Sequence, residues 1–265
     1  MEEKKSKILQ VGNLIAFFGT IIINGLANAL PLNGKGTGDL SDSYPNLCVP
    51  AGLTFSIWGV IYLLLAIYSF YQAGSLFKKE VSPGSYLEQI GPLFIISSAA
   101  NIAWIFFWHW ELVLLSLIAM LVILGSLLAI YLRLKIGRDE GKTRSTKEKW
   151  AVEVPFSVYL GWITVATIAN VVALAVDYEW SGWGISEEIW TIIVIVVALI
   201  ITALIQFTRE DIAYSAVISW ALLGIYIKRT DPEYTAAPSV ATTALIGTIL
   251  VLIGIVILAI RKLRK

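Results

Sequence analysis

The chain has 265 residues, of which 57% are apolar and only 15% are charged, and its net charge is +1. Soluble domains usually carry about 45–50% apolar and about 25% charged residues, so this composition excludes an ordinary soluble domain. The near-neutral charge provides no basic field, so nucleic acid is not an expected partner. A single cysteine and a single histidine exclude an intrachain disulfide and a multi-histidine metal site, and no metal ligands are predicted.

Apolar segments follow one another along the chain, most of them close to the roughly 20 residues that cross about 30 Å of hydrocarbon. Because lipid offers the backbone no hydrogen-bond partners, each segment is predicted to be a helix. The eight predicted spans cover residues 8–30, 51–73, 92–109, 112–133, 151–176, 189–208, 212–227 and 239–260. The third and seventh are short, which suits tilted or partly immersed helices. The predicted fold class is therefore all-α, a polytopic membrane protein in a lipid bilayer.

The lysines and arginines fall unevenly on the two sides of this arrangement. One set of ends and loops, which includes both termini, holds 17 of the 20 basic residues, and the opposite set holds Lys35, Lys228 and Arg229. Loops rich in lysine and arginine stay in the cytoplasm. Both termini of this integral membrane protein are therefore predicted to be cytoplasmic, and its composition suits a prokaryotic plasma membrane.

The predicted spans carry no acidic or basic residue near their middle. Coupled transporters and pumps usually place ionisable groups there, so ion coupling is not expected. No set of catalytic residues is recognised either. The outer half of the interior instead holds indoles and amides, which need hydrogen-bond partners in hydrocarbon. These groups either bond helices together or form a pocket for a planar apolar ligand; they are Trp58, Trp104, Trp162, Asn101 and Asn170.

The loop at residues 31–49 is the longest on the outer side and is rich in glycine, serine, asparagine and aspartate. This composition is typical of turns, and loops of this length often have a function. The loop is either a lid over an outward-facing pocket or a plain connector.

Three stretches in the second, third and fifth spans resemble signatures of the TspO/MBR family, the tryptophan-rich sensory proteins related to the translocator protein. The first is VPAGLTFSIWGVIY at residues 49–62, which is similar to the family's Pro-Pro…Trp-x-x-Leu-Tyr. The second is NIAWIFF at residues 101–107, similar to Asn-x-x-Trp…Phe-Phe. The third is VYLGWITVATIAN at residues 158–170, similar to Pro-Tyr-Leu-x-Trp…Ala…Asn. The three signatures together, in the family's order, are far more specific than any one of them.

The sequence also departs from this family. Val49 and Val158 stand where the family has prolines, although Pro155 lies one turn before Val158. The stretch ALAVDYEW at residues 173–180 lacks the basic residue of the family's sterol-recognition motif, so sterol binding is not expected. Because the resemblance covers about residues 8–178, we expect a TspO-like five-helix unit at 1–180 and an additional three-helix transmembrane region at 181–265. The notable interior residues of that region are Gln206 and Trp220.

The resemblance implies a porphyrin-binding sensory or regulatory membrane protein, with a pocket open toward the first loop. Its ligand would be a tetrapyrrole (protoporphyrin IX or haem) or another planar apolar molecule, and no cofactor would be required. Trp58 and Trp162 would be stacking walls and indole donors, Asn101 would orient a polar edge of the ligand, and Ala166 would leave room beside Trp162. The full set of expected ligand-binding residues is Trp58, Asn101, Trp162, Ala166, Tyr62, Trp104 and Asn170.

Three other functions stay open. Light-dependent porphyrin breakdown is described for some members of the family, so the chain could be a photo-oxidative enzyme that uses Trp58 and Trp162. It could instead be a small-molecule transporter whose pathway the three extra helices complete. A structural membrane subunit would bind no small molecule at all.

Two further expectations concern haem and oligomers. Axial ligation of haem is not favoured, because His109 and Cys48 are predicted to lie at surface turns. Alanines four residues apart, such as Ala169 and Ala173, could support close helix packing within one chain or between two, which leaves a homodimer open.

Overall fold

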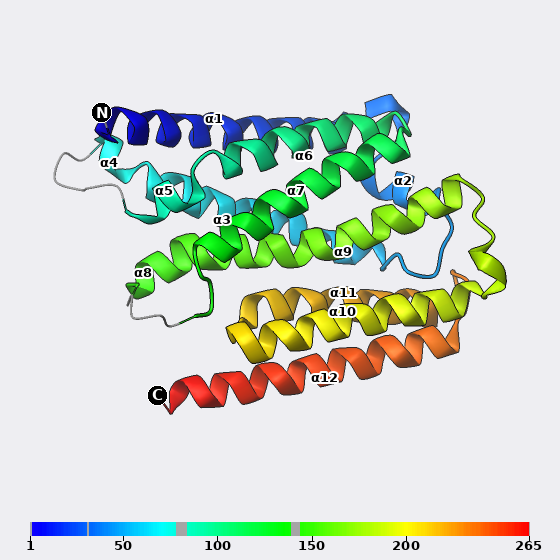
Figure 1. Ribbon diagram of the computed structural model, residues 1–265. Coiled ribbons are helices and arrows are strands. Elements are labelled where there is room, and N and C mark those ends of the chain that lie inside the picture. Colours follow the sequence, from blue (N-terminus) through cyan, green and yellow to red (C-terminus); the bar gives the residue numbers. More distant parts are fainter. Residues whose placement is uncertain (1, 31, 78–83, 139–143, 265) are drawn as a thin grey trace.

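The computed structural model describes residues 2–30, 32–77, 84–138 and 144–264. The described residues form helices and no strand, which confirms the predicted all-α class. The long helices run side by side, and both termini lie at the same end of the bundle (Figure 1). The long helices are α1 (Glu2–Ala29), α3 (Ile57–Gln72), α6 (Leu93–His109), α7 (Val113–Arg133), α9 (Val154–Asp177), α10 (Glu187–Arg209), α11 (Ile212–Thr230) and α12 (Pro238–Leu263).

Short helical segments occupy several of the connections. The first loop contains the 3-10 turn η1 (Leu32–Gly34) and the short helix α2 (Thr37–Asp42), and it leads into the 3-10 turn η2 (Gly52–Ser56). The connections at the end of the bundle that holds the termini contain α4 (Gly74–Phe77), α5 (Tyr86–Ile90), α8 (Thr146–Glu148) and the π-helical turn η3 (Lys149–Glu153), and the turn before α10 contains the 3-10 turn η4 (Gly182–Gly184).

Six of the described helical segments are long and apolar enough to cross a membrane, and they make the chain a polytopic membrane protein. They are Glu3–Ala29, Gly52–Gln72, Val113–Arg133, Thr146–Asp177, Glu187–Arg209 and Pro238–Leu263. Two of the eight predicted spans fall short of this: α6 has only 17 residues, and α11 is less apolar. Helix α11 packs against α9, α10 and α12, so protein rather than lipid surrounds most of it, and it needs less hydrophobicity.

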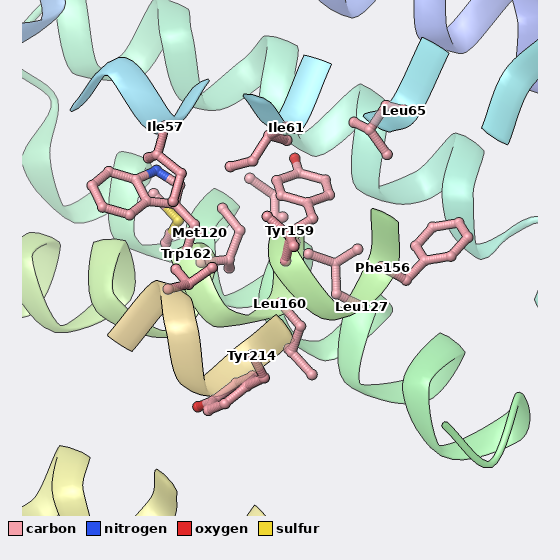
Figure 2. Packing of buried hydrophobic residues seen from close by; sticks show 14 of the residues in the cluster. Ile57, Ile61, Leu65, Met120, Leu127, Phe156, Tyr159, Leu160, Trp162 and Tyr214 are labelled. Atoms are coloured by element: carbon pink, nitrogen blue, oxygen red, sulfur yellow. The ribbon is translucent and has the colours of Figure 1, made fainter. Parts of the chain in front are cut away.

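Helix α9 lies at the centre of the bundle and packs against α3, α7 and α11. Figure 2 shows its aromatic side chains Phe156, Tyr159 and Trp162 among apolar residues of the neighbouring helices. Tyr214 of α11 lies on the opposite side of α9 from Ile61 of α3 in the same view. The indole predicted to be a pocket wall, that of Trp162, therefore belongs to a central helix that packs against helices of both regions.

The C-terminal helices are joined closely to the first unit. The backbone N–H of Ala51 donates to the carbonyl of Gly224, and the Trp220 indole donates to the carbonyl of Thr54, both at 3.0 Å. A Cβ on Gly224 would lie 2.0 Å from the Thr54 hydroxyl, so only glycine allows this approach. Within the C-terminal region, the Gln206 amide donates to the carbonyl of Val251. The interior residues noted in these helices thus serve helix packing.

Candidate ligand-binding site

A small cavity lies between α3, α6 and α9, beneath the first loop. Its volume is about 50 Å³. Five of the seven predicted site residues line it, and the remaining walls come from the first loop, η2, α6 and α9. The lining residues are Trp58, Trp104, Trp162, Ala166 and Asn170, with Thr37, Ser41, Val49, Pro50, Phe55, Trp108, Val165, Ala169 and Ala173.

A second cavity of about 210 Å³ adjoins the first, with which it shares Thr37, Phe55, Trp58 and Trp104. Tyr62, the sixth predicted residue, lines this second cavity. The two spaces therefore lie on either side of the same four residues.

The Trp58 and Trp162 indoles of the cavity meet edge to face, whereas those of Trp104 and Trp108 are stacked. The ring centroids of Trp58 and Trp162 are 6.2 Å apart at an interplanar angle of 84°, and Phe55 meets Trp162 at 5.8 Å and 87°. Trp58 also stacks on Tyr62 at 5.6 Å. These arrangements are the favoured ones for aromatic pairs. The rings form an apolar wall in which each ring covers part of its neighbour's surface.

The Trp162 indole is a donor without an acceptor. Its side chain is only 2% exposed, and its Nε1 has no hydrogen-bond partner among the described residues. A buried donor without a partner costs roughly 1–3 kcal/mol, so such groups are rare unless something else satisfies them. The Trp104 indole differs, because its Nε1 donates to the Asn170 side chain at 3.0 Å. Trp162 is thus a fully buried donor in the wall of this cavity that has no acceptor among the described residues.

Asn101 lies away from the cavity that it was expected to serve. It is fully buried and lines neither of the two spaces. Its side-chain oxygen accepts from the Asn24 amide at 2.7 Å, and its own amide donates to the Tyr159 hydroxyl at 3.3 Å. Asn101 therefore links α1, α6 and α9 by hydrogen bonds. Its amide serves helix packing, the alternative to ligand binding that the sequence left open.

The first loop covers the cavity and is bonded to both halves of the protein. Toward the five-helix unit, the Trp108 indole donates to the carbonyl of Thr37 at 3.3 Å. Toward the C-terminal helices, Lys228 pairs with Asp42 at 2.6 Å, and the N–H of Leu47 donates to the Glu187 carboxylate at 2.6 Å. The loop therefore connects the roof of the cavity to α10 and α11.

His109 and Cys48 do not lie at the surface, contrary to expectation. His109 is fully buried at the end of α6, where its ring nitrogens contact the carbonyl of Ile105 and the hydroxyl of Thr37. Cys48 is 7% exposed, and burial raises the pKa of its thiol to about 12. The prediction that both residues lie at surface turns is therefore wrong. The described residues include no cluster that could hold a metal ion.

Sequence reasoning missed the polar residues of α1. Asn24 and Asn28 line the second cavity, and deeper in the helix the Gln10 amide donates to the carbonyl of Gln72. The Asn13 amide donates to the Tyr68 hydroxyl at 3.2 Å. Amides at helical spacing in an otherwise apolar segment were the available signal, because such spacing places them on one face. Three of these four α1 side chains, Gln10, Asn13 and Asn24, are at most 4% exposed, so that face points inward.

Of the alanine pairs, Ala169 and Ala173 line the first cavity, so they face the inside of this chain.

The model of the TSPO-like protein family matches residues 8–257. The match extends beyond the three signatures, through α10 and α11 and into α12. No curated protein and no solved structure matches the chain. A family match over nearly the whole length, on an all-α polytopic framework, places the chain in the TSPO-like protein family.

Proposed function

We propose that this protein binds a flat apolar ligand, a tetrapyrrole such as protoporphyrin IX, between α3, α6 and α9, and that it acts as a membrane sensor or regulator. The observation that carries the proposal is the Trp162 indole, a buried donor without a protein acceptor in the wall of an aromatic cavity. A polar atom of the ligand would accept from this N–H, and the ring system would lie against Trp58 and Phe55. Ala166, one turn along α9, keeps the wall shallow there.

The cavity must enlarge to admit such a ligand. Pockets for drug-sized molecules are about 300–1,000 Å³, well above the roughly 50 Å³ and 210 Å³ of the two adjoining spaces. Rotation of Trp58 and Phe55 would merge the two spaces, and movement of the first loop would open the roof. Because the open form is a minor state, association is expected to be slower than diffusion allows.

Loop movement also supplies a route for a signal. The loop is bonded to α10 through Leu47 and Glu187, and to α11 through Asp42 and Lys228. A ligand that displaces the loop would alter these contacts at the outer end of the C-terminal helices. This coupling supports a sensory role for the additional helices.

The test is a titration of the purified full-length protein with protoporphyrin IX in the dark, followed by the shift of the porphyrin Soret band. The parent is compared with Trp162→Phe and Trp58→Phe, and Trp150→Phe is the matched control because Trp150 is 64% exposed and lines neither cavity. Loss of one hydrogen bond of about 0.5–1.5 kcal/mol predicts roughly two- to twelvefold weaker binding for Trp162→Phe.

Absence of saturable binding, or equal affinities for Trp162→Phe and the parent, would refute the proposed site. Repeating the titration under illumination separates binding from photochemical turnover. A binding protein quenches porphyrin emission and keeps the Soret band, whereas a photo-oxidative enzyme loses the band and forms product.

A further inference from the structure

A larger cavity lies outside the indole-lined site, at the seam between α9 and α10. Its volume is about 480 Å³, within the range of small-molecule pockets. Its walls come from the outer half of α9, the turn before α10, the first part of α10 and the Pro45–Cys48 part of the first loop. Because α10 forms one wall, the five-helix unit cannot build this cavity by itself.

The two ends of this cavity differ in chemistry. At the outer end are the carboxylates of Glu179 and Glu187, and deeper in the bundle the walls are the valines Val171, Val172 and Val194. Glu179 follows Val171 by eight residues and Val194 follows Glu187 by seven, so the cavity extends roughly 10–12 Å along the helices. This shape suits a molecule with one polar end and an apolar chain.

Indoles lie beside the carboxylates. Trp180 and Trp190 line the cavity, with ring centroids 5.2 Å apart. The Trp190 N–H already donates to the carbonyl of Gly182 at 2.9 Å, so this ring offers its face rather than its donor. Indole faces attract cations, including ammonium groups.

The charged side chains that line the outer end of the cavity are both acidic, Glu179 and Glu187. None of the residues that line the cavity is a lysine or an arginine. Glu187 already accepts from the N–H of Leu47 and interacts with Arg229, which lies outside the lining. Glu179 is exposed and stands just beyond the C-terminus of α9, where a carboxylate interacts unfavourably with the helix dipole. Helix stability therefore does not account for this carboxylate, and a cation in the cavity would be its favourable partner.

We propose that the α9–α10 cavity binds an amphiphilic amine, with its ammonium group between Glu179, Glu187 and the Trp180–Trp190 indoles, and with its alkyl chain between the valines of α9 and α10. The ammonium group can belong to a lipid headgroup such as phosphatidylethanolamine or to a free amphiphile, since both present the same chemistry. The site is separate from the tetrapyrrole site and does not depend on it.

The test uses full-length protein in nanodiscs of phosphatidylglycerol, whose headgroup carries no ammonium. A dodecylamine that carries a photoreactive diazirine is crosslinked to the protein, and the modified peptides are mapped by mass spectrometry. We expect saturable labelling at residues 171–176 and 190–194, competed by decylamine and not by decyl sulfonate. Labelling that maps elsewhere, or equal competition by the sulfonate, overturns the proposal.

Variants locate the site more sharply. Ala175→Phe fills the cavity and is expected to abolish the mapped labelling, whereas Ala216→Phe, at an exposed alanine of α11, leaves it unchanged. Glu179→Gln changes an exposed side chain, keeps the fold, and is expected to weaken labelling by up to about fivefold, the measured range for exposed ion pairs. Parent-like labelling of both Ala175→Phe and Glu179→Gln overturns the site.

A second set of nanodiscs that contain phosphatidylethanolamine distinguishes the two sources of the ammonium group. Reduced labelling there identifies a lipid headgroup as an occupant. Unchanged labelling, with decylamine still competing, identifies a free amphiphilic amine. Either result supports the site.

Discussion

The contact between Gly224 and the start of α3 gives the sharpest structural prediction. In Gly224→Ala the new Cβ would lie 2.0 Å from the Thr54 hydroxyl oxygen, 2.9 Å from the Pro50 Cβ and 3.0 Å from the Thr54 Cβ. Carbon atoms normally pack at about 3.5–4.0 Å. Rotation of the Thr54 side chain can move its hydroxyl, but it cannot move the Thr54 Cβ or the Pro50 ring, so η2 must move from α11.

The magnitude follows from two opposing effects. Overpacking of this kind typically costs about 1–3 kcal/mol, while alanine in a helix interior gains up to about 1 kcal/mol over glycine. Because the 2.0 Å overlap is severe, the cost is expected in the upper part of that range, about 2–3 kcal/mol, and the net loss in the free energy of unfolding is roughly 1–2 kcal/mol. At about 2–4 °C per kcal/mol for a chain of this size, Tm should fall by roughly 2–8 °C.

The assay is thermal unfolding of the detergent-purified protein. Gly125→Ala in α7 is the control, because no atom lies within 4 Å of the Cβ it would add. The control is expected to melt at or above the Tm of the parent. If the two variants melt together, the approach of α11 to η2 is not rigid and the reasoning is refuted.

Three further predictions concern groups outside the indole-lined cavity. Because burial raises the pKa of Cys48 to about 12, its alkylation by iodoacetamide at mildly alkaline pH should be roughly a thousandfold slower in the folded than in the denatured protein; equal rates would contradict this. Asp211→Ala removes an acceptor from the Ser157 hydroxyl and the N-cap of α11, and should cost about 2–4 kcal/mol in thermal unfolding; a loss no greater than that of a surface aspartate would refute the prediction. Lys228→Met breaks the pair with Asp42 and should increase protease cleavage within the first loop, with less than about 1 kcal/mol change in global stability; unchanged cleavage would show that the pair does not hold the loop.

Several site residues were predictable because their placement is local. Trp162, Ala166 and Asn170 are four residues apart on one helix, so they share a face wherever that helix packs. The structure places all three on one cavity. The positions of the helices were predictable for a similar reason, since hydropathy and backbone hydrogen bonding within a helix depend on neighbouring residues in the chain.

Asn101 shows where such reasoning ends. Its position in α6 was predictable, but the direction of its amide depends on Asn24 of α1 and Tyr159 of α9, which are distant in sequence. Burial of α11 likewise depends on which helices surround it, so its polarity alone did not reveal that it is enclosed.

The sequence by itself determined the membrane class, the helices and the family signatures, because each depends on residues that are close along the chain. Only the tertiary structure decided that α11 docks on η2, that the first loop joins both halves, and that the cavity of about 480 Å³ opens between α9 and α10. These features arise from contacts between segments as far apart as Thr54 and Trp220. Side-chain packing between helices sets such contacts, and no local pattern along the chain records it.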